Sequence, residues 1–312
     1  MSRLTLPADA RVAVIAPAGR FAKDRLLAGC DTLRAWGYRP VFGPNLFAAD
    51  RYHAGTPAER LDDFVWAATD PAIDAIWLAR GGFGCAHLLP QLPWERLAAR
   101  PLIGFSDATA LHTALWQAGW TTAQGGALVH GPVVQTMAPA PPAGSTSPVL
   151  VDHETRAALR EVLSGHAVPL PGRRLCGPPG RRDGPVVGGN LTVLASLCGT
   201  PWQLQGAGCI VVLEDVGEAP YRLDRLVTQL LQAGCLDGCA GLALGQFIDA
   251  QGTDADGLDY GPLDVLRDRL TPLGVPVLCD LPVGHGPRNL PWQVGRRGVL
   301  TDGGLLWAFG DE

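Results

Sequence analysis

The sequence predicts an α/β protein of two domains: an N-terminal domain with a parallel sheet covered by helices on both faces, and a second, smaller α/β domain. Between residues 11 and 134, short apolar runs typical of strands alternate with segments of helical periodicity, and this alternation begins again at Val186. Short connections between strand and helix favour a parallel sheet. The 312 residues are enough for two such domains.

The domain boundaries are predicted from the distribution of proline and glycine. Residues 137–146 read MAPAPPAGST, and residues 171–184 are again rich in proline, glycine and arginine. Such stretches are typical of loops and linkers. We therefore predict an N-terminal α/β domain over residues 1–136, an interdomain connection over 137–185 with one short helix at 152–163, and a C-terminal α/β domain over 186–312.

The elements of the N-terminal domain follow from hydrophobic periodicity. In chain order they are a strand at 12–16, a helix at 24–36, a strand at 75–78, a helix at 84–89, a strand at 102–103 and a helix at 108–116. Active sites of parallel sheets lie beyond the carboxyl ends of the strands. Three loops are expected there, namely residues 17–19, 80–84 and 104–107.

The same reasoning predicts the elements of the C-terminal domain. In chain order they are a helix at 188–198 opened by Gly188-Gly189-Asn190, a strand at 209–213, a helix at 221–232, a strand at 241–247, a helix at 263–270, an extended segment at 275–278 and a hairpin around 302–304.

Composition and charge exclude several classes of protein. The formal net charge is −5, and the densest group of cations, the arginines at 173, 174, 181 and 182, lies among prolines and glycines, so we expect no nucleic-acid partner. The first seven residues lack the apolar core of a secretory signal, and no run approaches the roughly 20 apolar residues of a membrane helix. We expect a cytosolic protein that binds no membrane.

The cysteines predict neither disulfides nor metal binding. All eight are scattered, mostly within apolar segments, and no pair has the C-x2-C spacing of a zinc site. The closest pair, Cys235 and Cys239, has no partner pair and no nearby histidine. We therefore expect buried reduced thiols, no metal and no cofactor.

The stretch around Ser106 resembles a nucleophile elbow. Gly104 follows the apolar run 101–103, and a predicted helix begins at Ala108, so Ser106 lies on a strand-to-helix turn. Such a turn projects a hydroxyl from the carboxyl edge of a sheet, with backbone amides facing any anion that forms there. Only the first half of G-x-S-x-G matches. The alternative is an ordinary helix N-cap that accepts the amide of Thr109.

Two other places put a titratable group just beyond a strand. Glu214, Asp215 and Glu218 follow an apolar run, and His285 lies between two glycines. The acidic residues could instead stabilise the start of a helix near Tyr221. Together with Ser106 these groups supply a nucleophile, a base and a carboxylate to orient the base. The order Ser, Glu, His is that of α/β-hydrolases, and it predicts an active site in the cleft between the two domains.

Seven motifs in the same order along nearly the whole chain resemble those of the LD-carboxypeptidases, serine peptidases of peptidoglycan recycling that are also called muramoyltetrapeptide carboxypeptidases. The family also includes microcin self-immunity peptidases. The motifs are Arg80-Gly81-Gly82-Phe83-Gly84, Ile103-Gly104-Phe105-Ser106-Asp107, His130-Gly131-Pro132, Gly188-Gly189-Asn190-Leu191, Gly199-Thr200-Pro201-Trp202, Leu213-Glu214-Asp215 with Glu218 and Tyr221-Arg222, and Gly284-His285.

The resemblance implies a catalytic triad of Ser106, Glu214 and His285, with Glu214 preferred to Glu218 because it stands first in the L-E-D run. It also implies a backbone oxyanion hole, formed by the amides of Gly82, or of Gly81 in its place, and Asp107. Phe83 stands where the family more often has tyrosine. Glycines at 81 and 82 suit this role, because they let backbone amides approach a reacting carbonyl closely.

The resemblance further implies a muropeptide substrate, cleaved at the L,D peptide bond to its terminal D-alanine. Candidate contacts to the substrate are Arg80, Gly81 and Asn190, although Arg80 could equally form a structural ion pair. Homodimers occur in the family, and the composition neither supports nor opposes one.

Three other functions remain as alternatives. A self-immunity peptidase that cleaves a peptide–nucleotide antibiotic would need an aromatic pocket for the base, but residues 241–275 hold few aromatics. A two-lobed binding protein without catalysis would leave Ser106 unreactive. A metallohydrolase lacks support, since there is no H-E-x-x-H motif. The glycines at 81–84 could also be interpreted as a nucleotide-phosphate loop, but they lack the G-x-G-x-x-G spacing of such a loop.

Overall fold

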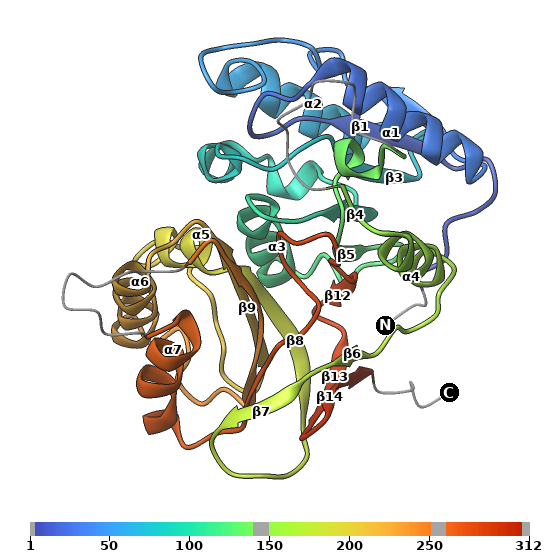
Figure 1. The fold of residues 1–312 in the computed structure, drawn as a ribbon. Helices are drawn as coiled ribbons and strands as arrows, with labels where there is room; N and C mark the ends of the chain where they lie inside the picture. The colour runs from blue at the N-terminus through green and yellow to red at the C-terminus, as the bar shows by residue number, and fades with distance from the viewer. Residues whose placement is uncertain (1–3, 140–149, 251–259, 308–312) are drawn as a thin grey trace. The chain divides into compact units, whose positions relative to one another are not determined.

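The computed structural model describes residues 4–139, 150–250 and 260–307, and its chain forms two compact units (Figure 1). The N-terminal unit comprises residues 1–166 together with 291–293, and the C-terminal unit comprises residues 167–290 and 294–312. Each unit has its own sheet, with helices packed against it. The prediction of an α/β protein with two sheets is confirmed.

The stretch 137–185, predicted as a connection, contributes regular structure to both units. Helix α4 (His153–Leu163) belongs to the N-terminal unit, whereas strands β6 (Leu170–Pro171) and β7 (Arg173–Cys176) belong to the sheet of the C-terminal unit. Residues 140–149, which include most of the proline-rich run, lie outside the described residues.

The N-terminal sheet has six strands in the order β12-β5-β4-β3-β1-β2. Neighbouring strands from β5 to β2 are parallel, as predicted. Their carboxyl ends therefore share one edge of the sheet, where the loops after β1, β3 and β4 emerge. The strands are β1 (Arg11–Ile15), β2 (Arg39–Phe42), β3 (Ala75–Leu78), β4 (Pro101–Gly104), β5 (Ala127–His130) and β12 (Trp292–Val294).

The helices of the N-terminal unit include one that periodicity did not reveal. Helices α1 (Lys23–Ala35) and α3 (Ala108–Gln117) lie where they were predicted, whereas α2 (Pro57–Thr69) was missed although Thr56 and Glu59 form a capping box at its start. Strands β2 and β5 were missed as well.

The predicted helix at 84–89 is wrong. The chain there forms two single 3₁₀ turns, η1 (Cys85–His87) and η2 (Leu89–Gln91). Pro90 lacks a backbone N–H and cannot continue a helix interior. Two further 3₁₀ turns are η3 (Trp94–Arg96) and η4 (Val134–Met137).

The C-terminal sheet has eight strands in the order β6-β14-β13-β8-β9-β10-β11-β7. Its centre is parallel and its margins are antiparallel. The predicted hairpin is confirmed as the pair of strands on either side of residues 302–303. The remaining strands are β8 (Arg182–Asn190), β9 (Ile210–Val216), β10 (Gly241–Ile248), β11 (Val277–Cys279), β13 (Arg297–Thr301) and β14 (Gly304–Trp307).

Two boundaries in the C-terminal unit differ from prediction. Gly188 and Gly189 belong to the end of β8 rather than to a helix, and α5 (Leu191–Ser196) begins only after Asn190. Strand β9 continues through Glu214 and Asp215 to Val216, because both residues pair in register with β10 or β8. The other helices are α6 (Pro220–Gln232), α7 (Pro262–Leu270) and the 3₁₀ turn η5 (Thr271–Leu273).

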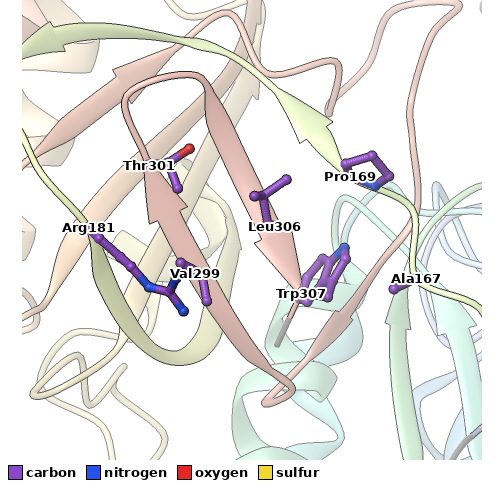
Figure 2. Close-up of a pocket in the computed structure, with 7 residues that line it drawn as sticks. All are labelled: Ala167, Pro169, Arg181, Val299, Thr301, Leu306 and Trp307. Carbon is purple, nitrogen blue, oxygen red and sulfur yellow. The ribbon is translucent and has the colours of Figure 1, made fainter. Parts of the chain in front are cut away.

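A pocket of ≈ 540 Å³ lies on the β13–β14 hairpin of the C-terminal unit (Figure 2). Val299, Leu306 and Trp307 line it together with Arg181, and none of the predicted site residues belongs to its lining. Over the described ranges, no helix is long and apolar enough to cross a membrane.

Candidate active site

Ser106 lies on a strained turn at the carboxyl end of β4. The strand ends at Gly104 and helix α3 begins at Ala108, so the serine falls on the strand-to-helix turn that the sequence predicted. Its φ angle is +63°, in the left-handed region that residues other than glycine rarely adopt. Backbone strain of this kind costs about 1–3 kcal/mol and clusters at functional sites. The side chain is half-buried.

The start of helix α3 is held by backbone atoms. The amide of Thr109 donates to the carbonyl oxygen of Ser106 at 2.9 Å. Asp107 stands at the N-cap position, but its side chain makes no capping bond. Its carboxylate accepts instead from the amide of Cys85, at 2.8 Å. The turn that carries Ser106 is thereby tied to the loop after β3.

The loop after β3 runs directly against Ser106. A Cβ added to Gly81 would lie 2.9 Å from the Cβ of Ser106 and 3.1 Å from its Oγ, so only glycine permits this approach. The carbonyl oxygen of Gly81 accepts from Gly19 at 3.1 Å, which joins the loop to the one after β1. Gly82 follows with φ +109°. Arg80, the first residue of the loop, donates to the carbonyl oxygen of Arg20 rather than to a carboxylate.

In the C-terminal unit, His285 and Glu214 are in direct contact. The Nδ1 atom of His285 lies 2.7 Å from Oε2 of Glu214, whose side chain is completely buried at the end of β9. Burial opposes protonation of the imidazole, but the charge and hydrogen bond of Glu214, with a contribution from Asp215, raise the pKa of His285 above its usual 6.5. A buried carboxylate that orients a histidine is the arrangement of a general base.

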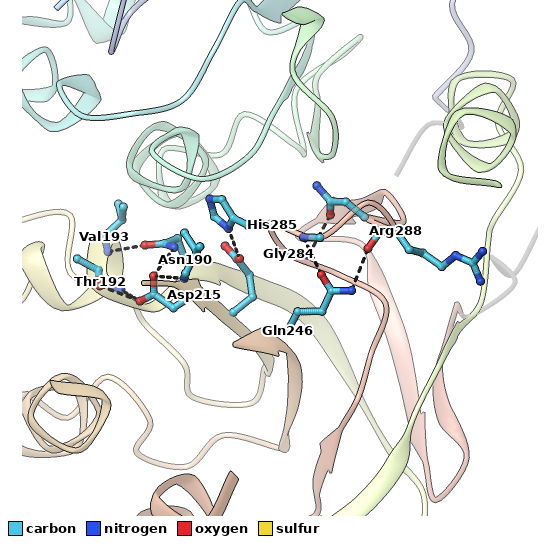
Figure 3. A network of polar contacts seen from close by, with 12 residues as sticks. Asn190, Thr192, Val193, Asp215, Gln246, Gly284, His285 and Arg288 are labelled. Carbon is cyan, nitrogen blue, oxygen red and sulfur yellow. Dashed lines mark hydrogen bonds and ion pairs between the residues drawn. The ribbon is translucent and has the colours of Figure 1, made fainter. Parts of the chain in front are cut away.

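Two side-chain amides that the sequence analysis missed hold the loop of His285 (Figure 3). Oε1 of Gln246 accepts from the amide of Gly286 at 2.9 Å, and its Nε2 donates to the carbonyl oxygen of Arg288 at 3.1 Å. Oδ1 of Asn289 accepts from the amide of Gly284 at 3.1 Å. The sequence feature that could have indicated Gln246 is its place as a polar residue in the otherwise apolar strand β10, near the carboxyl end of that strand.

Asp215 and Asn190 organise the start of α5 (Figure 3). Oδ1 of Asp215 accepts from Nδ2 of Asn190 at 2.9 Å, and its Oδ2 accepts from the amide and hydroxyl of Thr192 at 2.9 and 2.7 Å. Oδ1 of Asn190 accepts from the amide of Val193 at 3.1 Å. Asp215 therefore stabilises α5 and not the helix near Tyr221, which was the alternative considered for it.

The structure groups the predicted residues by unit. The N-terminal unit brings the turn of Ser106 and Asp107 next to the loop of Gly81 and Gly82, and Arg80 begins that loop. Glu214 and His285 are in contact in the C-terminal unit, where Asn190 pairs in register with Glu214. The carboxylate that bonds His285 is that of Glu214, whereas Glu218 pairs with Arg222 at 3.4 Å. Within the described part of the chain, no group of three or more metal-ligating side chains is assembled.

Comparison with known proteins assigns the family. Residues 12–125 match the model of the LD-carboxypeptidase N-terminal domain, and residues 183–300 match that of the C-terminal domain. The murein tetrapeptide carboxypeptidase of Pseudomonas aeruginosa is 38% identical over 96% of this chain and 96% of its own. The chain belongs to the LD-carboxypeptidase family. It is therefore a hydrolase of the serine peptidase type, a serine-type LD-carboxypeptidase.

Solved structures place the fold in the same family. The crystal structure of muramoyltetrapeptide carboxypeptidase from Oxalobacter formigenes has a TM-score of 0.79 at 26% identity, covering 97% of this LD-carboxypeptidase and 100% of that chain. The microcin C7 self-immunity protein MccF of Escherichia coli is 27% identical over 86% of this chain and 83% of its own. The structure of MccF in complex with glutamyl sulfamoyl guanosine shares the fold, with a TM-score of 0.82 at 20% identity and 99% coverage of both chains.

Proposed function

We propose that this LD-carboxypeptidase cleaves the L,D peptide bond to the terminal D-alanine of murein tetrapeptides during peptidoglycan recycling, with Ser106, His285 and Glu214 as its catalytic triad. The contact of Glu214 with Nδ1 of His285 carries the proposal for the triad. A carboxylate bonded at Nδ1 favours the tautomer with its lone pair on Nε2, the atom that a general base uses. The relative from Pseudomonas aeruginosa supports the proposed substrate.

In the proposed reaction Ser106 is the nucleophile. Its hydroxyl attacks the scissile carbonyl while Nε2 of His285 takes the hydroxyl proton, and Glu214 stabilises the imidazolium that forms. The carbonyl oxygen becomes an anion that accepts from the amides of Gly82 and Asp107. Collapse of this intermediate releases D-alanine, whose amine takes the proton from His285. Water, activated by the same histidine, then hydrolyses the acyl-enzyme.

Three further residues have proposed roles in substrate binding. Gly81 lies against Ser106, and Arg80 precedes it in the same loop, with its guanidinium donating to the carbonyl oxygen of Arg20. We assign the guanidinium to the substrate's carboxylate and the backbone of Gly81 to the substrate's peptide backbone. Both ends of the Asn190 amide are bonded to Asp215 and Val193. These bonds assign Asn190 to holding the start of α5 beside the Glu214 position, and its contact with the substrate stays a prediction.

Two assays test this proposal. Mass spectrometry should find the tripeptide and D-alanine after incubation with a defined murein tetrapeptide, and a fluorophosphonate should label the enzyme at Ser106 and leave Ser106→Ala unlabelled. Absence of labelling would reject the serine mechanism and favour a binding protein without catalysis. Cleavage that persists at full rate in Ser106→Ala would assign the chemistry to other residues.

A second candidate function is cleavage of a peptide–nucleotide antibiotic, because the fold and 27% of the aligned residues are shared with the self-immunity protein MccF. A pocket for the base would need aromatic side chains, but the sequence between residues 241 and 275 holds only Phe247 and Tyr260 as aromatic residues. Residues 251–259 of this stretch lie outside the described ranges. An aminoacyl sulfamoyl nucleoside cleaved faster than the murein tetrapeptide would select this function.

A further inference from the structure

One peptide group in the loop after β3 is held between two buried charges. The carbonyl oxygen of Gly84 accepts from Nη1 of Arg60 at 2.9 Å, and the amide of the same peptide group, on Cys85, donates to Oδ2 of Asp107 at 2.8 Å. The two charged side chains are buried, with Arg60 1% and Asp107 2% exposed. A cation thus meets the negative end of the peptide dipole, and an anion meets its positive end.

This arrangement restricts the rotation of the peptide group. Turning its plane would break both charge-assisted hydrogen bonds in a buried environment, where unpaired groups are costly. Gly84 has φ +136°, and a Cβ there would lie 2.5 Å from Nη1 of Arg60, so only glycine fits. The conformation of the loop is therefore coupled to the two side chains.

Both side chains are themselves anchored. Arg60, on helix α2, also donates to the carbonyl oxygens of Pro17 at 2.6 Å and Gly55 at 3.2 Å, so it links the loop to two others at the same edge of the sheet. Asp107 directly follows Ser106 in the chain. The clamped peptide group consequently connects the loop of Gly81 and Gly82 to the turn of the nucleophile.

We propose that Arg60 and Asp107 act as positioning residues, which clamp the Gly84–Cys85 peptide group and thereby hold the amides of the loop in place for the oxyanion. This inference rests on the proposed function, because it assumes the oxyanion hole near Ser106. Preorganised donors stabilise the transition state and not the bound substrate, so a displaced donor lowers kcat and leaves KM nearly unchanged.

The test compares Asp107→Ala with Asp107→Asn. We expect Asp107→Ala to lower kcat on the tetrapeptide by about 10–100-fold with KM changed less than about threefold, somewhat below the loss seen when a donor is deleted outright. Asn keeps an oxygen that accepts from Cys85, so Asp107→Asn should recover most of that loss. The rate at which a fluorophosphonate labels Ser106 should fall in parallel, because its phosphoryl oxygen also needs the oxyanion donors.

Asp63 provides a matched control. It is a carboxylate of the same unit, 3% exposed, that accepts from the amide of Asn45 at 2.8 Å and from its Nδ2 at 3.1 Å. We expect Asp63→Ala to lower the melting temperature and leave both kcat and the labelling rate unchanged. If Asp107→Ala unfolds, the labelling rate of Asp107→Asn measured against Asp63→Asn decides the question: a small loss confined to Asp107→Asn supports the role of Asp107, because a neutral oxygen accepts more weakly than a carboxylate, and equal rates overturn it.

Any of three results would overturn the proposed positioning role. Asp107→Ala could fold and keep the wild-type kcat and labelling rate, Asp107→Asn could be as impaired as Asp107→Ala, or the loss of activity in Asp107→Ala could lie entirely in KM. Failure of the proposed function is a separate outcome. An enzyme that is labelled at Ser106 but leaves the murein tetrapeptide intact has another substrate, and the labelling rates of the variants still decide the role of Asp107.

Discussion

At the scale of single residues, Ser106, the proposed nucleophile, lies on a strained turn. With φ +63°, it holds a conformation that costs an L-residue about 1–3 kcal/mol and glycine very little. Such strain persists only where the surrounding structure imposes it. Here the loop of Gly81 lies against the side chain, and the hydrogen bond that Asp107 accepts from the amide of Cys85 ties that loop to the turn.

Replacing Ser106 should separate stability from activity. We expect Ser106→Ala and His285→Ala to lower kcat by roughly four to six orders of magnitude, because members of a triad act as a unit. Ser106→Gly should be equally inactive, but about 1 kcal/mol more stable than Ser106→Ala, since glycine relieves the strain. Thermal unfolding and product release measure the two effects. Retention of a tenth of the activity in either alanine variant would remove that residue from the mechanism.

The pH profile should report the ionisation of His285. Only the neutral imidazole can accept a proton, so activity should rise with pH through the pKa of His285, which the Glu214 carboxylate raises above 6.5. In Glu214→Gln the raising charge is lost while burial still lowers the pKa, so the midpoint should move to lower pH and the rate should fall. A rate that is flat from pH 5 to 8 in the wild type would contradict the role of general base.

Glu218 tests which acidic residue serves the histidine. It pairs with Arg222 on the first turn of α6 rather than with His285. The Arg222 side chain is about half exposed, and ion pairs open to solvent contribute about 0–1 kcal/mol, so Glu218→Gln should keep nearly full activity and most of the stability. Steady-state kinetics of the two glutamine variants make the comparison. Greater damage from Glu218→Gln than from Glu214→Gln would move the triad carboxylate to residue 218.

At the scale of elements, short helix α5 depends on the buried residues before it. Asp215 accepts from Asn190, twice from Thr192 and from the amide of Val216 at 2.8 Å, so one carboxylate satisfies donors on two neighbouring strands and on the helix. With only six residues, α5 would be marginal without tertiary support. Its position beside the end of β9 is therefore a property of this network.

We expect Asp215→Ala to lower the free energy of unfolding by about 2–4 kcal/mol, because several buried donors lose their partner. Asp264 is the comparison: exposed at the start of α7, it accepts from the amide of Gly261 at 2.9 Å, and its loss as Asp264→Ala should cost about 1 kcal/mol or less. Urea unfolding measures both. Equal losses would mean that the Asp215 network does not stabilise the unit.

At the scale of the whole molecule, specificity for a terminal residue requires recognition of a free carboxylate. A carboxypeptidase gains a charge-assisted contact from that group, and an amidated or longer substrate loses it. We expect the murein tetrapeptide to be cleaved to the tripeptide, the pentapeptide far more slowly and the amidated tetrapeptide barely at all. Mass spectrometry of the products compares the three. Equal rates on the free and amidated tetrapeptides would replace the proposed specificity with that of an amidase or immunity peptidase.

Elements whose evidence is local were predictable from the sequence. Periodicity and turn residues correctly indicated three strands, five helices, one turn and one hairpin. These are β1, β3 and β4, helices α1, α3, α4, α6 and α7, the turn at Ser106 and the β13–β14 hairpin. Strand β2 and helix α2 were missed, and the glycines at 188 and 189 were interpreted as the opening of a helix although they end β8. Glycine favours a turn locally, but pairing with β9 decided that these two belong to a strand, with φ angles of +113° and +140° that glycine tolerates.

By itself, the sequence determined the alternation of strand and helix, the strand-to-helix turn of Ser106 and the ordered motifs that place the chain in its family. Each of these is a pattern among neighbouring residues. Tertiary structure decided which of three acidic residues meets His285, what Asn190 bonds, and that Arg60 and Asp107 hold opposite ends of one peptide group. Those contacts join residues far apart in the chain, so they depend on how the strands align in the folded sheet, and no local pattern encodes them.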